Sequence, residues 1–167
     1  TATSSDINLH ASGAVTQTAA LTANELGLHG SDTFTLQNSS NNVATIAGGT
    51  SGARLGNIAY RDADALEIGS VNGTDGFFSG GTVLIETENG NLTLSKNIDT
   101  TSGSDDAIIL NAGRASSAGT ASGGDIIVSG SPTLTYGSLG RAKLFSGTDE
   151  NSSGLTALAD ETRSGFD

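Results

Sequence analysis

The chain has 167 residues, of which 24 are Gly, 22 Ser, 21 Thr, 12 Asn and 12 Asp. This composition excludes a helical bundle, because these residues favour turns and strands over helix interiors. Leu, Ile, Val and Phe total only 36 residues, so we expect a thin, repetitive core. A net charge of -11 with seven Lys and Arg opposes nucleic-acid binding, and the absence of Cys excludes disulfides and thiolate chemistry.

We expect no membrane insertion, because no apolar run approaches the roughly 18 residues of a membrane-spanning helix. The sequence opens on Thr1 without a recognisable signal peptide. We therefore expect the chain to be a processed product or a piece of a longer protein.

The first two predicted strand units repeat the same side-chain pattern. Leu9-His10-Ala11-Ser12 of the first unit corresponds to Leu28-His29-Gly30-Ser31 of the second, and at the same shift Val15-Thr16 corresponds to Phe34-Thr35. A weaker similarity, at a shift of 100, relates residues 30–36 to 130–136. Each unit consists of a short strand, a tight polar turn and a second short strand. Such a unit buries its apolar face only when neighbouring units stack on it.

Apolar positions that recur at intervals of 17 to 24 residues predict the leading strand of each unit. These positions are Leu9, Leu28, Ile46, Ile68, Ile85, Ile109, Ile127 and Leu144. Apolar and polar residues alternate within the predicted strands 34–36, 66–68 and 92–94, which places the apolar side chains inward. The pattern predicts an all-β fold, a parallel β-solenoid (β-helix) of roughly eight coils.

An antiparallel β-sandwich or barrel is the alternative fold, because it also consists of short strands at regular spacing. Asn72-Gly73 and Asn89-Gly90 are typical of its hairpin turns. The repeat from Leu9 to Leu28 favours the solenoid, since stacked coils share side chains at equivalent positions and the strands of a sandwich need not.

We predict a single solenoid domain over residues 1–146, followed by an acidic polar tail or linker over residues 147–167. Two irregular segments interrupt the rhythm of the repeat. Residues 114–124 are predicted to form a loop that leaves the coil, and residues 97–106 lengthen the interval between Ile85 and Ile109. No second domain is predicted.

Several segments resemble the repeats of filamentous-haemagglutinin-like proteins. They are residues 13–17, 21–23, 26–28, 34–36, 41–48, 90–98 and 123–128. The resemblance extends over roughly positions 7 to 146 and implies a right-handed parallel β-helix within a large bacterial protein that is secreted to the cell surface. It further implies a role in adhesion, biofilm or cell contact, without catalysis. The secretion domain of that family is not visible in this sequence.

Parallel β-helices also include polysaccharide lyases and hydrolases, whose active sites need converging carboxylates. Asp62 with Asp64, and Glu86 with Glu88, are the acidic pairs that could share a strand face. We interpret all four as solvated charges on outward faces. With no Trp and two Tyr, aromatic platforms for a sugar chain are scarce. An enzyme that acts on carbohydrates is thus the less favoured alternative.

Metal binding has three candidate segments. Calcium needs several converging oxygen ligands, and the turns at residues 72–76 and 104–106 carry Asn and Asp side chains. Such side chains usually satisfy their own backbone, so we expect no cofactor, with calcium as the alternative. His10 and His29 occupy equivalent positions and are predicted to stack about 4.8 Å apart on an outward face, as solvent-facing imidazoles rather than a metal pair. We interpret the four glycosylation sequons as chance matches; they begin at Asn38, Asn72, Asn91 and Asn151.

The sequence as a whole predicts a secreted, non-enzymatic structural or adhesive module. The ends of a solenoid expose unpaired backbone groups unless they are capped. No amphipathic helix adjoins Ile7-Asn8-Leu9 or Lys143-Leu144-Phe145, so we expect both ends to be open. The predicted partners are other copies or flanking repeats of the same protein, stacked end to end into a fibre or stalk, and glycans of a host or neighbouring cell.

Overall fold

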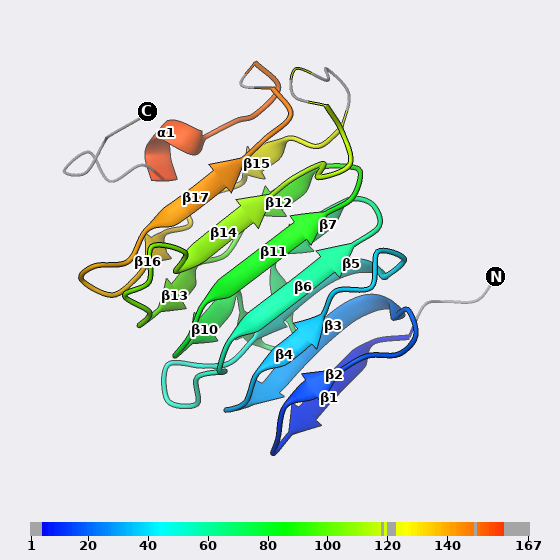
Figure 1. The fold of residues 1–167 in the computed structure, drawn as a ribbon, viewed down its shortest axis with the longest axis vertical. Helices are drawn as coiled ribbons and strands as arrows, with labels where there is room; N and C mark the ends of the chain where they lie inside the picture. The colour runs from blue at the N-terminus through cyan, green and yellow to red at the C-terminus, as the bar shows by residue number, and fades with distance from the viewer. Residues whose placement is uncertain (1–4, 118, 120–122, 149, 159–167) are drawn as a thin grey trace.

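The computed structural model describes residues 5–117, 119, 123–148 and 150–158, and nearly all its regular structure is β-strand (Figure 1). Fifteen strands form two large sheets. Sheet A contains β1 (Ile7–Ala11), β3 (Thr22–Gly30), β5 (Asn42–Gly48), β7 (Leu66–Ile68), β10 (Phe77–Ser79), β12 (Leu92–Leu94), β13 (Ile98–Thr100), β15 (Ile126–Val128) and β16 (Leu134–Thr135). Sheet B contains β2 (Val15–Thr16), β4 (Phe34–Leu36), β6 (Ile58–Asp62), β11 (Val83–Thr87), β14 (Ile108–Asn111) and β17 (Ala142–Phe145).

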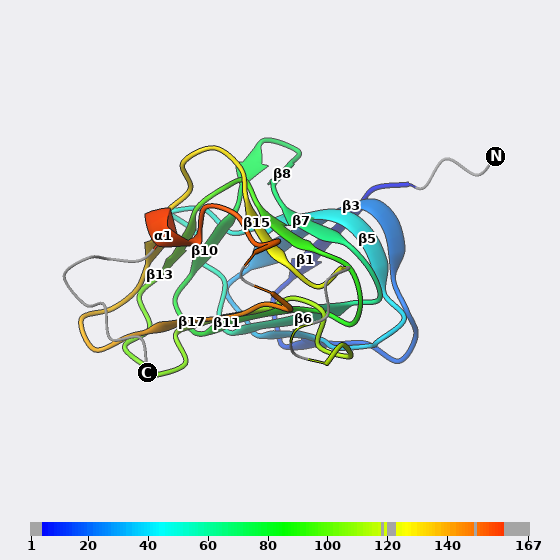
Figure 2. The same ribbon diagram turned by 90° about the horizontal axis from the view of Figure 1, so that it is seen from above.

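Every strand pair within these two sheets is parallel. The antiparallel sandwich is therefore wrong, and the arrangement is that expected of a parallel β-solenoid. Figure 1 shows the first strands at one end of the long axis and β17 toward the other, and Figure 2, seen from above, shows the two sheets as layers that face each other. No helix in the described part of the chain is long and apolar enough to cross a membrane.

Sheet A divides into two branches at β5. Thr45 and Ile46 of β5 pair with β7, whereas Gly48 at the end of β5 pairs with Phe77 of β10. One branch continues from β7 through β12 to β15, and the other continues from β10 through β13 to β16. The long strands β3 and β5 thus give way to pairs of short strands along the stack.

The predicted register is confirmed at the N-terminal end. Leu9 of β1 lies opposite Leu28 of β3, and Val15 of β2 lies opposite Phe34 of β4. The predicted inward alternation of strands 34–36, 66–68 and 92–94 is also confirmed, because both apolar residues of each strand are buried.

The eight predicted leading positions do not lie in one column of stacked side chains, so their number does not give the number of coils. Ile85 and Leu144 belong to sheet B, whereas Ile46 and Ile68 belong to sheet A. Ile109 and Ile127 are only half-buried, while the residues before them, Ile108 and Ile126, are fully buried. The prediction missed the inward residue by one position, which in a strand moves a side chain to the opposite face.

The actual column in sheet B is unevenly spaced along the chain. It runs through Val15, Phe34, Ile58, Val83, Ile108 and Ala142, and its longest interval is the last. The four middle residues are buried, and the first and last are half-buried. The similarity at a shift of 100 has no structural counterpart, because Phe34 lies in sheet B and Leu134 lies in sheet A.

The two predicted hairpin turns have different roles. Asn72-Gly73, with φ of 48° and 81°, joins the antiparallel hairpin of β8 (Ser70–Val71) and β9 (Thr74–Asp75). Asn89-Gly90 instead turns the chain from β11 in sheet B to β12 in sheet A. The hairpin lies against the outer side of β3 and β5 and stands out from the stack in Figure 2.

Small residues on sheet A make room for this hairpin. Val71 is fully buried, and a Cβ added to Gly27 would lie 3.4 Å from its Cγ1 and 2.5 Å from Asn8 Oδ1. The Asn72 amide donates to Asn8 Oδ1 at 3.2 Å, which ties the hairpin to β1. The hairpin is therefore a fixed ridge on the side of the stack.

Of the two predicted irregular segments, one contains a strand and the other is only partly described. Residues 97–106 contain β13, which pairs with β10 and β16, so their interpretation as irregular is wrong at Ile98–Thr100. The predicted loop at 114–124 lies partly outside the described residues.

In the predicted tail, the Ser153 amide donates to the Ile126 carbonyl at 3.1 Å, and α1 (Leu155–Leu158) packs Leu155 and Leu158 against the core.

Candidate functional site

The predicted acidic pairs lie at the ends of the neighbouring strands β6 and β11 of sheet B, and Asp62 and Glu86 lie on opposite faces of that sheet. In β6, Tyr60 points inward, so Arg61 points outward and Asp62 points inward again. In β11, Ile85 points inward and Glu86 outward. The register places Glu86 opposite Arg61 of β6 on one side and opposite Asn111 of β14 on the other.

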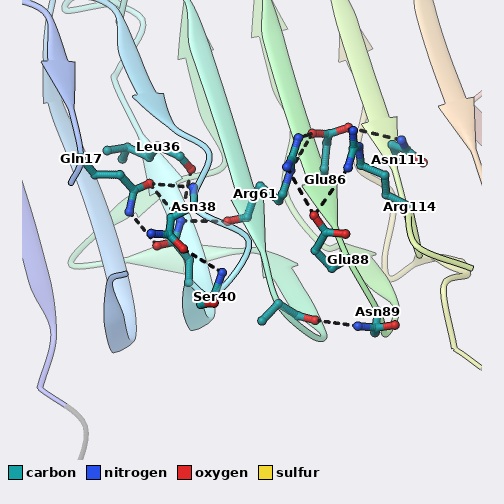
Figure 3. Close-up of polar contacts among 12 residues, drawn as sticks. Gln17, Leu36, Asn38, Ser40, Arg61, Glu86, Glu88, Asn89, Asn111 and Arg114 are labelled. Atoms are coloured by element: carbon teal, nitrogen blue, oxygen red, sulfur yellow. Dashed lines mark hydrogen bonds and ion pairs between the residues drawn. The ribbon is translucent and has the colours of Figure 1, made fainter. Parts of the chain in front are cut away.

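On the outer face this register produces a compact ionic group, which we call the outer cluster: Arg61, Glu86, Glu88, Asn111 and Arg114. Arg61 donates to Glu86 Oε2 from Nε at 3.2 Å and from its terminal nitrogen at 3.1 Å. Arg114 Nε lies 3.2 Å from Glu86 Oε1, and the Asn111 amide donates to the same oxygen at 3.3 Å. Glu88 Oε1 lies 3.3 Å from Arg61 and 3.6 Å from Arg114. Figure 3 shows these side chains converging from adjacent strands.

The interpretation of Glu86 as a solvated charge is wrong, because the two guanidinium groups leave its side chain only 8% exposed. Both carboxylates thus form ion pairs with Arg61 and Arg114. The outer cluster instead joins β6, β11 and the segment after β14.

On the inner face, Asp62 is fully buried and not solvated as predicted. Its Oδ2 accepts hydrogen bonds from the Tyr60 hydroxyl at 2.6 Å and from the Val43 backbone amide at 3.0 Å. Its Oδ1 accepts from the Asp64 amide at 3.2 Å. Asp64 itself is exposed, as expected, and accepts from the Asn42 side chain at 3.0 Å. We call Tyr60, Asp62 and Val43 the inner cluster.

The inner cluster contains no cation, so no opposite charge offsets the burial of the Asp62 carboxylate. Burial raises the pKa of Asp62 to about 6, although the hydrogen bonds from Tyr60, Asp64 and Val43 act in the opposite direction. Burial, and then the Asp62 charge, raise the pKa of the Tyr60 hydroxyl above its usual range. Tyr60 is therefore the permanent donor and Asp62 the acceptor.

A buried amide network at a corner of the stack was missed by the sequence analysis. Asn41 is fully buried, and its Oδ1 accepts from the Leu21 amide and the Gln17 side chain, each at 2.8 Å. Its amide group donates to the carbonyls of Leu36 and Arg61 at 3.2 and 2.9 Å. Gln17 and its neighbours appear in Figure 3. The signal available in the sequence was the polar run at residues 38–42, which contains three Asn that can satisfy the backbone groups of a turn.

The predicted stacking of His10 on His29 is confirmed. The ring centroids lie 4.4 Å apart with an interplanar angle of 13°. Burial, and then the neighbouring His10, lower the pKa of His29. The described residues contain no group of three or more His, Cys, Asp or Glu side chains that could hold a metal ion.

The acidic side chains of the two candidate calcium turns are directed to other partners. Asp75 pairs with Lys96 at 3.4 Å, Asp105 with Arg141 at 3.4 Å, and Asp106 with Lys143 at 2.5 Å. Among the sequon residues, Asn38 accepts from the Ser40 amide, Asn72 donates to Asn8, and Asn91 accepts from the Asp125 amide.

Comparisons with protein-family models, with curated proteins and with solved structures found no match. The functional argument therefore rests on the geometry of this chain.

Proposed function

We propose that this chain is a non-enzymatic structural and adhesive module of a secreted bacterial surface protein. In this proposal it is a right-handed parallel β-helix that stacks end to end, with flanking repeats or further copies, into an extracellular fibre or stalk. Right-handed crossovers join parallel strands of one sheet in about 98% of cases, which supports the handedness. The observation that carries the proposal is that the end strands β1, β2, β16 and β17 each have one strand partner among the described residues.

At the N-terminal end, β1 pairs with β3 and β2 pairs with β4, and neither has a second partner among the described residues. Ile7, Leu9 and Val15 are half-buried there, whereas their register partners one strand further in are fully buried. An apolar edge with free N–H and C=O groups is a template for another strand.

The opposite end is partly open. β17 pairs only with β14, and β16 only with β13, in the described part of the chain. Leu144 is half-buried and Phe145 is 51% exposed. The outer side of β15 differs, because Ser153 exchanges hydrogen bonds with Ile126 and Val128. An N-terminal edge set on this end makes a head-to-tail contact, which propagates into a filament.

Charge favours axial over lateral association. The net charge of -11 repels copies that approach side by side, whereas axial stacking covers apolar edges. The occupied carboxylates of the outer cluster and the neutral hydrogen-bond donors around Asp62 support a non-enzymatic role over a carbohydrate-active β-helix enzyme.

The test is the assembly state of the isolated chain, measured by light scattering and electron microscopy. We expect thin particles whose length grows with concentration. Leu9→Lys, which places a charge on the open apolar edge, should give monomers, and Thr16→Lys, on the outer face of the edge strand β2, should not. A strictly monomeric wild-type chain at high concentration contradicts the proposal. Turnover of an acidic polysaccharide, seen as new reducing or unsaturated ends, contradicts its non-enzymatic part.

A further inference from the structure

A surface cleft of about 390 Å³ lies beside the ridge formed by β8 and β9. Asp75 of the hairpin forms one wall, and Phe78 of β10 contributes the aromatic surface. The other wall comes from two corner turns and includes Lys96, Asn97, Ser131 and Pro132. This volume lies near the lower end of the roughly 300–1,000 Å³ typical of small-molecule sites.

The stacking of coils fixes the shape of the cleft. Ile98 of β13 lies opposite Leu134 of β16, so the turns that precede these two strands also lie side by side. Asn97 Oδ1 accepts from the Thr133 backbone amide at 2.9 Å and joins the two turns. The hairpin on the other side is held by the buried Val71. The walls are thus formed before any ligand binds.

The polar groups of the cleft offer both hydrogen-bond donors and acceptors. Asp75 Oδ1 accepts from the Ser70 hydroxyl at 2.5 Å, and Asp75 Oδ2 lies 3.4 Å from Lys96 Nζ. The hydrogen bond from Ser70, and then the Lys96 ammonium, lower the pKa of Asp75, which is therefore ionised at neutral pH. The side chains of Asp75 and Lys96 remain 60% and 40% exposed, so both reach solvent in the cleft.

Phe78 is held in position by a fixed cation that lies over its ring. The Arg54 guanidinium carbon lies 5.6 Å from the ring centroid, and the same group donates to Asp99 Oδ1 at 3.0 Å and to the Ser79 carbonyl at 3.1 Å. The ring is half-buried, so part of its surface remains accessible. A fixed aromatic surface next to mixed polar groups binds an amphipathic ligand with little loss of side-chain entropy.

We propose that this cleft binds a neutral saccharide, namely one or two rings of an oligosaccharide. The C–H face of a sugar ring packs on Phe78, while its hydroxyls donate to Asp75 and accept from Lys96 and the Asn97 amide. The carboxylate and ammonium neutralise each other locally, and the chain carries a net charge of -11, which together disfavour acidic ligands.

This inference rests on the adhesive part of the proposed function and not on end-to-end stacking. The cleft lies on the side of the stack, formed by the hairpin and the corner turns, so joining two ends leaves it accessible. A chain carrying Leu9→Lys should therefore bind saccharide as the wild type does, which separates a failure of assembly from a failure of this site.

The test uses an array of immobilised neutral oligosaccharides of hexoses and N-acetylhexosamines, with sialylated and uronic-acid oligosaccharides beside them. We expect binding to neutral members and an affinity at least tenfold weaker for Phe78→Ala and for Lys96→Gln. The matched controls are Phe145→Ala and Lys143→Gln, because Phe145 is an exposed Phe, Lys143 forms an ion pair with Asp106, and neither residue lines the cleft.

Thermal melting of every variant separates binding from folding, and Lys96→Gln removes only a surface ion pair. Three results overturn the inference: no neutral oligosaccharide binds, acidic members bind in preference, or the cleft variants bind as tightly as their controls.

Discussion

The inner and outer faces of sheet B shield carboxylates from water in opposite ways. Glu86 on the outer face lies between the guanidinium groups of Arg61 and Arg114. Asp62 on the inner face, adjacent in sequence to Arg61, has only neutral donors: a hydroxyl and backbone amides. One register step between the neighbouring strands β6 and β11 therefore separates an ion-paired acid from an acid buried without a cation, because Glu86 lies opposite Arg61 and the next position pairs Thr87 with Asp62.

The difference follows from the hydrogen-bond donors that each face of sheet B offers to a carboxylate. Outward side chains of adjacent strands stack in register, so long Arg side chains reach across the row and keep part of their length in water. Inside the stack the donors to Asp62 Oδ2 are the Tyr60 hydroxyl and the Val43 amide, and neither carries a charge. A carboxylate in that setting loses hydration without a compensating charge, and its pKa rises.

The largest expected effect is that of Asp62→Ala. The substitution leaves the Tyr60 hydroxyl and the Val43 amide buried without an acceptor, and each such group costs about 1–3 kcal/mol. Removal of a buried charge offsets part of this, so we expect the free energy of unfolding at pH 7 to fall by about 3 kcal/mol. Urea denaturation measures it.

Asp64→Ala is the matched control for Asp62→Ala, because Asp64 is exposed two residues away. We expect it to change stability by less than about 0.5 kcal/mol. Equal losses in the free energy of unfolding in the two variants would show that the hydrogen bonds of the inner cluster make no specific contribution to stability.

Part of this contrast could be predicted from the sequence and part could not. The inward positions of Ile58 and Tyr60 place Asp62 inward by simple alternation, so the signal for its burial was present. The neighbours of Glu86 were not predictable, because Arg61 and Arg114 belong to other coils and only the three-dimensional register brings them together.

The same reasoning explains the errors in the fold prediction. The N-terminal register was predictable because the side chains of β1 and β2 recur in β3 and β4 at one constant shift. Later intervals in sheet B lengthen, most of all between Ile108 and Ala142, and strands of both sheets carry the same apolar alternation. The spacing of apolar residues along the sequence does not show which of the two sheets a strand joins. For this reason the spacing predicts Ile85 of sheet B in the same column as Ile68 of sheet A.

The second expected effect is a gain in stability on mild acidification. The pKa of Asp62 is about 6 in the folded chain, against a usual value of 3.8. The folded state therefore binds a proton that the unfolded state releases, and the stabilisation is full below about pH 4 and lost as the pH rises through 6. Between pH 7 and pH 5 we expect a gain of about 1 kcal/mol from this group.

The control for this pH dependence is Asp62→Asn, which cannot titrate. Its stability should not rise over the same interval in parallel urea titrations, because the lowered pKa of His29 acts in the opposite direction in both chains. A wild-type chain that gains no stability relative to Asp62→Asn between pH 7 and pH 5 contradicts the assignment of Asp62 as a carboxylate buried without a cation.

The smallest expected effect is that of Glu86→Gln in the outer cluster. The neutral amide still accepts a hydrogen bond, and Glu88 keeps its contacts with Arg61 and Arg114 at 3.3 and 3.6 Å. The Arg114 side chain is 44% exposed, so water solvates a guanidinium that loses its partner. We expect a loss of about 0.5 kcal/mol at low ionic strength, typical of partly exposed ion pairs. Because salt screens exposed charges, the loss should shrink in about 0.5 M NaCl, whereas the effect of Asp62→Ala should not. If Glu86→Gln destabilises the chain as much as Asp62→Ala and does so independently of salt, then the outer cluster behaves as a desolvated ionic core and the two faces of sheet B do not differ in the way that their contacts indicate.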